Sequence, residues 1–242
     1  MLRFDIVTIF PQIFDSYLKE SLLFRARKSK LLKINVHNLR KWAKGKHQVV
    51  DDRPFGGGLG MVMKVEPIYK AVTALKIRQL ADQITGFDKL TTGKFRSKPK
   101  TKVILFSPRG KKFDQKMATR WSKLNQIIFL CGRYEGVDER VAEHIADEVI
   151  SIGDFVMMGG EVATMAVIET VSRLIPGVIG KPTFLKERVM KNKSFIEYPQ
   201  YTRPEIFSPK KSVYWKSPKV LLSGNDKKIS EWKEMNGKKI GE

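Results

Sequence analysis

The stretch LCGRYEGVDERVAEHIADEVISIGDFVMMGGE, residues 130–161, decides how the whole chain is interpreted. It contains three glycine-rich bends: Gly132 and Gly153 each follow an apolar run, and Gly159 with Gly160 precede a helical pattern. Glycine lets a backbone approach a ligand closely and adopt positive φ angles. In open α/β sheets, ligands bind outside the carboxyl ends of the strands. The stretch therefore predicts a ligand pocket lined largely by main chain, although ordinary turns between strands and helices would also explain the glycines.

The sequence on both sides of this stretch alternates between strand and helix patterns. Helical spacing of apolar residues separates the expected strands and returns at 161–175, and Pro11 can open a first helix. The expected strands are 3–10, 31–36, 103–107, 127–131 and 149–152. This order predicts an α/β fold with a parallel, helix-covered sheet, and periodicity alone would indicate a Rossmann-like protein.

Two segments interrupt the alternation, on either side of a helix expected at 67–80. Residues 40–64 begin basic and continue with paired aspartates and four glycines, but they match neither a P-loop nor G-x-G-x-x-G. A long glycine-rich loop of this kind is usually functional or disordered. Residues 82–102 are expected to form an inserted loop, basic in its second half.

The charge of the chain is strongly positive. Lys and Arg number 46 against 25 Asp and Glu, which gives a formal net charge of +21. Such an excess favours a polyanionic partner, most often nucleic acid. A lysine-rich solvated surface is the alternative explanation.

Cysteine content and hydropathy limit the class of protein further. Cys131 is the single cysteine, so no internal disulfide framework is possible, and the three histidines lack zinc-site spacing. No apolar run reaches the roughly 18 residues of a membrane helix. Residues 1–11 resemble a first strand rather than a signal peptide. We therefore expect a cytoplasmic protein without membrane association or a metal site of its own.

Seven motifs, in order along the chain, resemble those of the bacterial tRNA (guanine-N1)-methyltransferases (TrmD family), which belong to the SPOUT class of knotted methyltransferases. The motifs are VDDRPFGGGLGMVM (50–63), SPRGKKFDQ (107–115), CGRYEGVDERV (131–141), SIGDFVMMGGE (151–161), SRLIPGVIG (172–180), EYPQYTRP (197–204) and VLLSGN (220–225). Any one of them would be weak evidence, but seven in the same order are specific.

The resemblance implies a fold that periodicity would not have predicted. A parallel sheet with a deep trefoil knot would form residues 1–180, a linker would follow at 181–196, and a small, mostly helical tRNA-binding domain would occupy 197–242. Relatives usually continue with a further helical stretch, so this second domain is expected to be shortened. The resemblance also implies a homodimer whose sites are built from both subunits.

The implied cofactor is S-adenosylmethionine, bent within the knot loops, with Mg²⁺ as a possible addition. The implied reaction is methylation of N1 of the guanine immediately 3′ of a tRNA anticodon, position thirty-seven, on the anticodon stem-loop. Carried over by motif, the cofactor-binding residues would be Pro108, Gly110, Gly132, Tyr134, Glu135, Ile152, Gly153, Asp154, Phe155, Val156, Met157, Gly159 and Gly160.

The implied catalytic residues are less completely matched. Arg173 would stabilise charge that develops on O6 of the guanine, and Glu135 is a further catalytic candidate. The family's general base is a linker Asp, whose position here falls on Arg188, Val189 or Lys193, depending on the alignment. The nearest carboxylate is Glu187, our first candidate for the base, with Glu197 second.

This mismatch leaves two functions open at the level of sequence. One is an active tRNA methyltransferase, and the other is a catalytically weakened or inactive homologue that binds RNA. A nicotinamide-dependent oxidoreductase would fit the alternation of strands and helices but lacks the dinucleotide-binding glycine fingerprint.

Overall fold

The computed structural model describes residues 1–85, 100–180 and 195–240. Its internal contacts divide the chain into two compact units, Met1–Pro182 and Thr183–Glu242. The linker expected at 181–196 lies almost entirely outside the described residues, so its boundaries stay a prediction.

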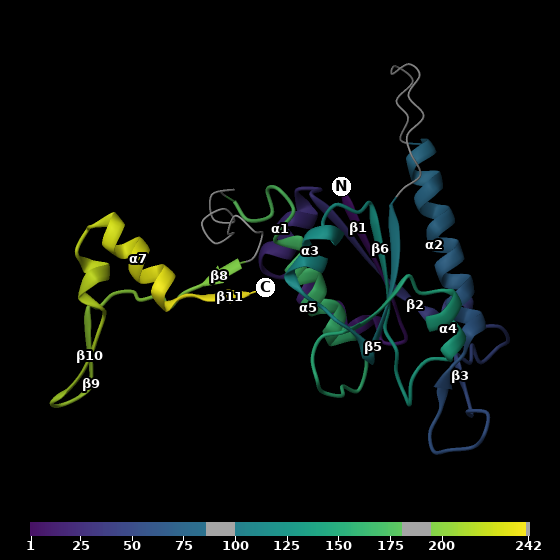
Figure 1. The fold of residues 1–242 in the computed structure, drawn as a ribbon. Coiled ribbons are helices and arrows are strands. Elements are labelled where there is room, and N and C mark those ends of the chain that lie inside the picture. The colour runs from purple at the N-terminus through teal and green to yellow at the C-terminus, as the bar shows by residue number, and fades with distance from the viewer. Residues whose placement is uncertain (86–99, 181–194, 241–242) are drawn as a thin grey trace. The chain divides into compact units, whose positions relative to one another are not determined.

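A five-stranded sheet organises the first unit, and every strand pairs in parallel with its neighbours, as the alternating pattern predicted (Figure 1). The strand order is β2-β1-β6-β5-β7. The bounds are β1 Leu2–Thr8, β2 Leu32–Asn38, β5 Thr101–Lys112, β6 Gln126–Leu130 and β7 Glu148–Ser151.

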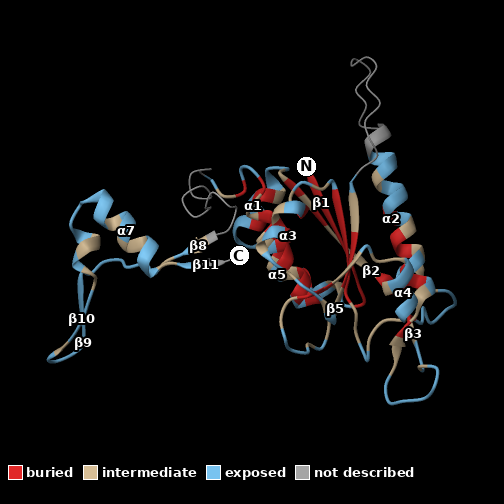
Figure 2. Cartoon of the chain, viewed as in Figure 1, coloured by how far each residue is buried: buried red, intermediate tan, exposed pale blue. Residues whose placement is uncertain are grey.

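Helices cover both faces of this sheet (Figure 1). One face carries α1 (Ser21–Lys28), α3 (Gln115–Trp121) and α5 (Glu161–Ser172), and the other carries α2 (Val65–Thr85) and α4 (Glu139–His144). The sheet is the most deeply buried layer, as Figure 2 shows.

The period-two geometry of a strand explains the two hydrophobic cores. In β6, Ile127 and Phe129 contribute to the core under α1, α3 and α5, whereas Ile128 and Leu130 contribute to the core under α2 and α4. A strand with two buried faces must be apolar throughout, which is why β6 appears in the sequence as a continuous apolar run.

The N-terminal helix differs from its prediction. Pro11 opens only a short 3₁₀ turn, η1 (Pro11–Phe14), which is followed by a second, η2 (Tyr17–Lys19), and then by α1. Ser21 has a φ of 59°, which interrupts the helical path at that point. The apolar spacing that suggested one helix therefore runs across three short ones.

The described parts of the two interrupting segments contain regular elements that the sequence did not predict. Residues 40–64 overlap a 3₁₀ turn, η3 (Leu39–Trp42), and include an antiparallel pair, β3 (Asp51–Asp52) with β4 (Val62–Met63). In the expected insertion, α2 extends to Thr85 and β5 begins at Thr101, so the prediction of a loop over 82–102 was wrong at both ends. Residues 86–99 lie outside the described residues.

The second unit has more strand than the mostly helical domain that the resemblance implied. It holds two antiparallel pairs, β8 (Phe195–Glu197) with β11 (Lys238–Ile240) and β9 (Ile206–Lys210) with β10 (Val213–Lys216). η4 (Lys219–Leu222) and α7 (Asp226–Asn236) complete it. The aromatic and β-branched residues of 206–216, on either side of a turn, favour a hairpin over a helix.

Candidate functional site

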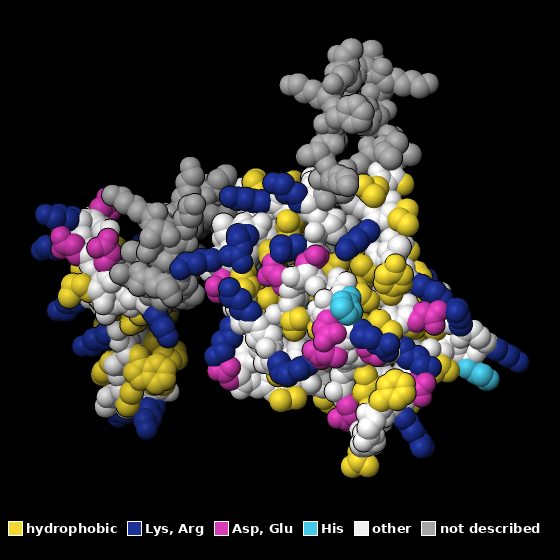
Figure 3. Space-filling model, turned by 45° about the vertical axis from the view of Figure 1, so that its right-hand side comes forward, with side chains coloured by type: hydrophobic (Ala, Val, Ile, Leu, Met, Phe, Trp, Pro, Cys, Tyr) yellow, Lys and Arg dark blue, Asp and Glu magenta, His cyan; other side chains and the backbone are white. Residues whose placement is uncertain are grey.

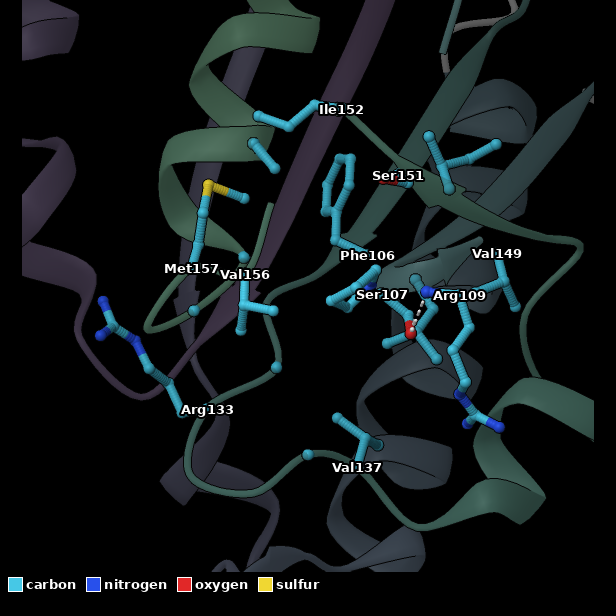
Figure 4. A pocket seen from close by; sticks show the side chains of 18 of the residues that line it. Phe106, Ser107, Arg109, Arg133, Val137, Val149, Ser151, Ile152, Val156 and Met157 are labelled. Atoms are coloured by element: carbon cyan, nitrogen blue, oxygen red, sulfur yellow. Dashed lines mark hydrogen bonds between the residues drawn. The ribbon is translucent and has the colours of Figure 1, made fainter. Parts of the chain in front are cut away.

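A cavity of about 500 Å³ lies at the carboxyl ends of β5, β6 and β7. Its walls are residues 105–109 of β5, the loop 132–137 after β6, and residues 149–160, which include the loop after β7 (Figure 4). The volume falls within the range of roughly 300–1,000 Å³ that is usual for small-molecule pockets. This is the edge of the sheet at which the glycine-rich bends predicted a ligand.

Two of the wall loops approach each other at backbone distance. The backbone N–H of Gly160 donates to the carbonyl oxygen of Gly132 at 3.0 Å. A Cβ atom at Gly160 would lie 2.9 Å from the Cα of Cys131. The position therefore requires glycine because of close approach, while its φ of −83° is open to any residue.

The glycine-rich segment 56–63 supports the same wall from behind. The backbone N–H of Glu135 donates to Met61 at 3.1 Å, and that of Met63 donates to Gly136 at 3.0 Å. A Cβ atom at Gly60 would lie 2.5 Å from the Glu135 side chain. Residues 60–63 thus hold the loop 132–137 in place.

A buried carboxylate lies where these loops meet α5. Glu161 accepts hydrogen bonds from Thr8 Oγ1 at 2.7 Å and from Arg133 Nε at 2.9 Å. Arg133 also packs over the ring of Phe10, 4.9 Å from its centroid. Burial raises the pKa of the Cys131 thiol, and Glu161 raises it further, so this cysteine stays protonated and is not a nucleophile.

Exposed ion pairs lie around the rim. Arg109 pairs with Glu139 at 2.6 Å and thereby joins β5 to α4. Lys112, the last residue of β5, pairs with Asp154 in the loop after β7. Both pairs are open to solvent, so they contribute little to stability.

The sequence model of a protein family described as tRNA (Guanine-1)-methyltransferase TrmD matches residues 2–240. The chain belongs to this tRNA (guanine-1)-methyltransferase family. It is 46% identical to the tRNA (guanine-N(1)-)-methyltransferase of Dictyoglomus turgidum, over 96% of this chain and 84% of the relative. It is 42% identical to the protein of the same name in a Geobacter species, over 96% of this chain and 83% of the relative.

A solved structure is similar over nearly the same length. The crystal structure of tRNA (m1G37) methyltransferase from Aquifex aeolicus has a TM-score of 0.70 and 37% sequence identity, and covers 96% of this chain and 87% of its own. Within the described part of this methyltransferase, no helix has the length and apolar character needed to cross a membrane.

The structure of this methyltransferase brings most of the predicted cofactor-binding residues together around the cavity. They are Pro108, Gly132, Tyr134, Glu135, Ile152, Gly153, Phe155, Val156, Met157, Gly159 and Gly160. Gly110 instead lies against β7, where a Cβ would be 2.5 Å from the Ile150 nitrogen. Asp154 pairs with Lys112 and does not line the cavity.

Two of the predicted catalytic residues, Glu135 and Arg173, lie apart within the first unit. Glu135 lines the cavity, but Arg173 follows the last residue of α5 at the opposite end from Gly160. At about 1.5 Å of rise per residue, the two ends lie about 20 Å apart. Glu197 belongs to β8 of the second unit, and Glu187 lies outside the described residues.

Several cavity residues were not predicted from the sequence. Ser107, Arg109 and Arg133 line the cavity and occur inside motifs that resemble those of the family. The motifs therefore indicated this part of the chain, although none of the three was named as a site residue. Phe106 and Val149 line the cavity from within strands, where their apolar side chains look like ordinary core residues.

The cavity fits the cofactor of this family better than a metal ion. Its walls combine close-packed glycine backbone with apolar side chains such as Phe106, Ile152 and Met157 (Figure 4). Across residues 1–85, 100–180 and 195–240, no group of three or more His, Cys, Asp or Glu could hold a metal. The possible Mg²⁺ therefore finds no support among these residues.

Proposed function

We propose that this methyltransferase transfers a methyl group from S-adenosylmethionine to N1 of the guanine immediately 3′ of a tRNA anticodon, position thirty-seven. The observation that carries the proposal is the cavity at the ends of β5, β6 and β7, whose walls are the family's own motifs. The similar structure from Aquifex aeolicus is that of a tRNA (m1G37) methyltransferase, which supports the position. The anticodon stem-loop is the substrate region, and a cytoplasmic location follows from that substrate.

Main-chain groups would bind the adenosine. The loops 132–137 and 152–160 offer backbone N–H and C=O groups beside apolar walls, which suits an adenine edge and ring. When bound, S-adenosylmethionine supplies a methyl group on a sulfonium, which is already a strong electrophile. The protein therefore needs to orient the guanine, exclude water and manage one proton.

The proton is the N1–H of the guanine. Methyl transfer would form the N1–CH₃ bond at the expense of the bond between sulfur and the methyl carbon, with S-adenosylhomocysteine as the leaving product, and the N1 proton would pass to a general base of this protein. We assign Glu187 as that base, with Glu197 second, and Arg173 as the cation that stabilises charge on O6. Glu135, whose carboxyl group lies beside Gly60 in the cavity wall, would orient the base or the cofactor.

A homodimer would reconcile these residues. Arg173 lies about 20 Å along α5 from the cavity of its own chain, so a second copy would have to supply it. Exposed apolar side chains at the start of α5 support such a surface, among them Phe10, over which Arg133 packs, and Val162, which is 60% exposed. We also propose the deep trefoil knot for the first unit, because membership of the family implies it.

The test is methyl transfer from S-adenosylmethionine labelled in its methyl group to an unmodified tRNA transcript. A matched transcript has adenine in place of the guanine after the anticodon. We expect label in the guanine transcript only. Equal labelling of both transcripts, or none of either, would contradict the proposal.

A further inference from the structure

The hairpin of β9 and β10 exposes an aromatic surface that the cavity does not use. Phe207 is 49% exposed, and Tyr214 and Trp215 are each 61% exposed. On the second unit, Figure 3 shows hydrophobic side chains at the surface with Lys and Arg beside them. Exposed apolar side chains that gather in one place usually mark an interaction site.

The pairing of the strands sets two of these rings side by side. Trp215 lies opposite Phe207 in the antiparallel register, with ring centroids 5.6 Å apart and planes inclined by 50°. The register shifts between Val213 and Trp215, so Tyr214 occupies the irregular position. The result is a small aromatic platform on a narrow two-stranded support.

Three lysines belong to the same hairpin as the aromatic platform. Lys216 lies opposite Ile206 in the register, Lys210 lies opposite Val213, and Lys211 occupies the turn. Among the described residues, none of the three lysines forms a salt bridge. Residues 206–216 contain no Asp or Glu.

We propose that this hairpin binds unpaired bases of the RNA substrate, stacking them on Trp215 and its neighbours while the lysines contact phosphates. Aromatic faces stack on any base, and cations beside them follow the backbone. The inference rests on the proposed function, because it assumes that RNA is the substrate. It assigns a contact surface separate from the cavity in which the methyl group is transferred.

Other occupants fit the surface less well. A second copy of a chain with a net charge of +21 is a poor electrostatic match for a cluster of lysines. Lysines by themselves could be explained as charges that keep an exposed strand edge from pairing with another chain. That explanation does not account for a tryptophan, a tyrosine and a phenylalanine left open to solvent.

The test compares RNA affinities of the full chain by fluorescence anisotropy, with the tRNA transcript and with an oligouridylate of about 10 nucleotides as probes. Trp215→Leu removes stacking but keeps an apolar partner for Phe207. We expect it to weaken oligouridylate binding about tenfold, with Trp215→Phe restoring most of the affinity. Lys210→Gln with Lys211→Gln should weaken both probes and lower the salt slope by about 1.4.

The matched control is Lys227→Gln with Lys228→Gln, which removes the same charge from exposed positions of α7 in the same unit. If this control weakens RNA binding as much as the hairpin pair does, only net charge matters and the assignment is overturned. A Trp215→Leu variant that becomes monomeric with unchanged oligouridylate affinity would assign the surface to a second copy. Failure of the wild-type chain to methylate tRNA would instead count against the proposed function.

Discussion

The carboxylate of Glu161 accepts a hydrogen bond from Arg133 Nε at 2.9 Å, and their side chains are only 1% and 19% exposed. This contact joins the first residue of α5 to the loop that follows β6. The hydroxyl group of Thr8, the last residue of β1, donates a hydrogen bond to the other carboxylate oxygen of Glu161. Three segments distant in sequence therefore meet at one buried charge beside the cavity, which makes Arg133 and Glu161 positioning residues.

Arg133→Gln should destabilise the protein and loosen the cavity. Removing one partner of a buried ion pair leaves the other charge uncompensated, which costs about 3–5 kcal/mol. We expect a lower midpoint in chemical denaturation and a raised KM for S-adenosylmethionine, with a smaller change in kcat. Adding Glu161→Gln to the Arg133→Gln variant should recover part of both losses.

The control for this prediction is Arg109→Gln, which removes an exposed pair with Glu139 on the rim of the cavity. Its effect on the free energy of unfolding should stay below about 1 kcal/mol. Equal destabilisation by Arg133→Gln and Arg109→Gln would show that the buried pair has no special role.

Gly160→Ala should weaken cofactor binding. The new methyl group would lie 2.9 Å from backbone atoms of Cys131, which cannot move without displacing β6. We expect about a tenfold or greater loss of affinity for S-adenosylhomocysteine in calorimetry, and about 1–3 kcal/mol of destabilisation. Gly180→Ala is the matched control, because nothing lies within 4 Å of its Cβ position. Similar effects of the two substitutions would contradict the close-approach argument.

Asp5 should make folding sensitive to acid. Burial alone would raise the pKa of this carboxyl group, but hydrogen bonds from His37, Arg3, Gln126 and Asn35 outweigh burial and lower the pKa from 3.8 to about 2. A lowered pKa in the folded state stabilises the fold above pH 4, and this contribution, about 2 kcal/mol, is lost as the pH falls toward 2.

Asp5→Asn should therefore lower the free energy of unfolding near neutral pH by at least about 2 kcal/mol and remove that part of the acid dependence. Urea denaturation at a series of pH values from 6 down to about 2 measures both. The control is Asp52→Asn, which breaks an exposed pair with Lys64 and should change little. If Asp5→Asn keeps the acid sensitivity of the wild-type protein, Asp5 is not the group whose titration destabilises the fold.

Subunit complementation tests whether Arg173 acts in the cavity of a second copy. Arg173→Ala homodimers should be nearly inactive, and Gly160→Ala homodimers should keep about a tenth or less of wild-type transfer when S-adenosylmethionine is held well below the KM of that variant. Mixed and re-equilibrated in equal amounts, they should recover about a quarter of wild-type methyl transfer, since one site in each heterodimer would have both intact parts. Absence of recovery, with heterodimers shown by native mass spectrometry, would mean that cavity and arginine act within one chain.

Glu187→Gln should lower kcat about 10²–10⁴-fold if Glu187 takes the N1 proton. The same substitution at Glu197 provides the comparison, since it is the second candidate. Single-turnover transfer across a range of pH separates loss of the base from loss of binding. If neither substitution changes the rate, the base is neither Glu187 nor Glu197.

The parallel sheet and most of the cavity could be predicted from the sequence, for physical reasons that particular residues show. Continuous apolar runs such as that of β6 identify strands with two buried faces. Gly132 and Gly160 could be identified from their places in the sequence. Gly132 follows the apolar run of a strand and Gly160 precedes a helical pattern, and glycine at such places lets the backbone approach a ligand closely. The hairpin at 206–216 was not predicted, because the resemblance implied a mostly helical domain for this part of the chain.

The contacts that organise the cavity could not be predicted in the same way. Nothing in the local sequence indicates that Thr8, Arg133 and Glu161 meet, because that depends on the order of strands in the sheet. The separation of Arg173 from the cavity also required the length and direction of α5. Gly110 and Asp154 were assigned by motif, and the sequence did not indicate that Gly110 lies against β7 or that Asp154 pairs with Lys112.

The measurement that tests the central claim most directly is nucleoside analysis of the methylated product. Wild-type protein, S-adenosylmethionine and an unmodified tRNA transcript are incubated, and the RNA is digested and analysed by mass spectrometry against methylguanosine standards. We predict 1-methylguanosine, derived from the guanine immediately 3′ of the anticodon. A methyl group on another atom or nucleotide, or tRNA binding without any methylation, would contradict the account.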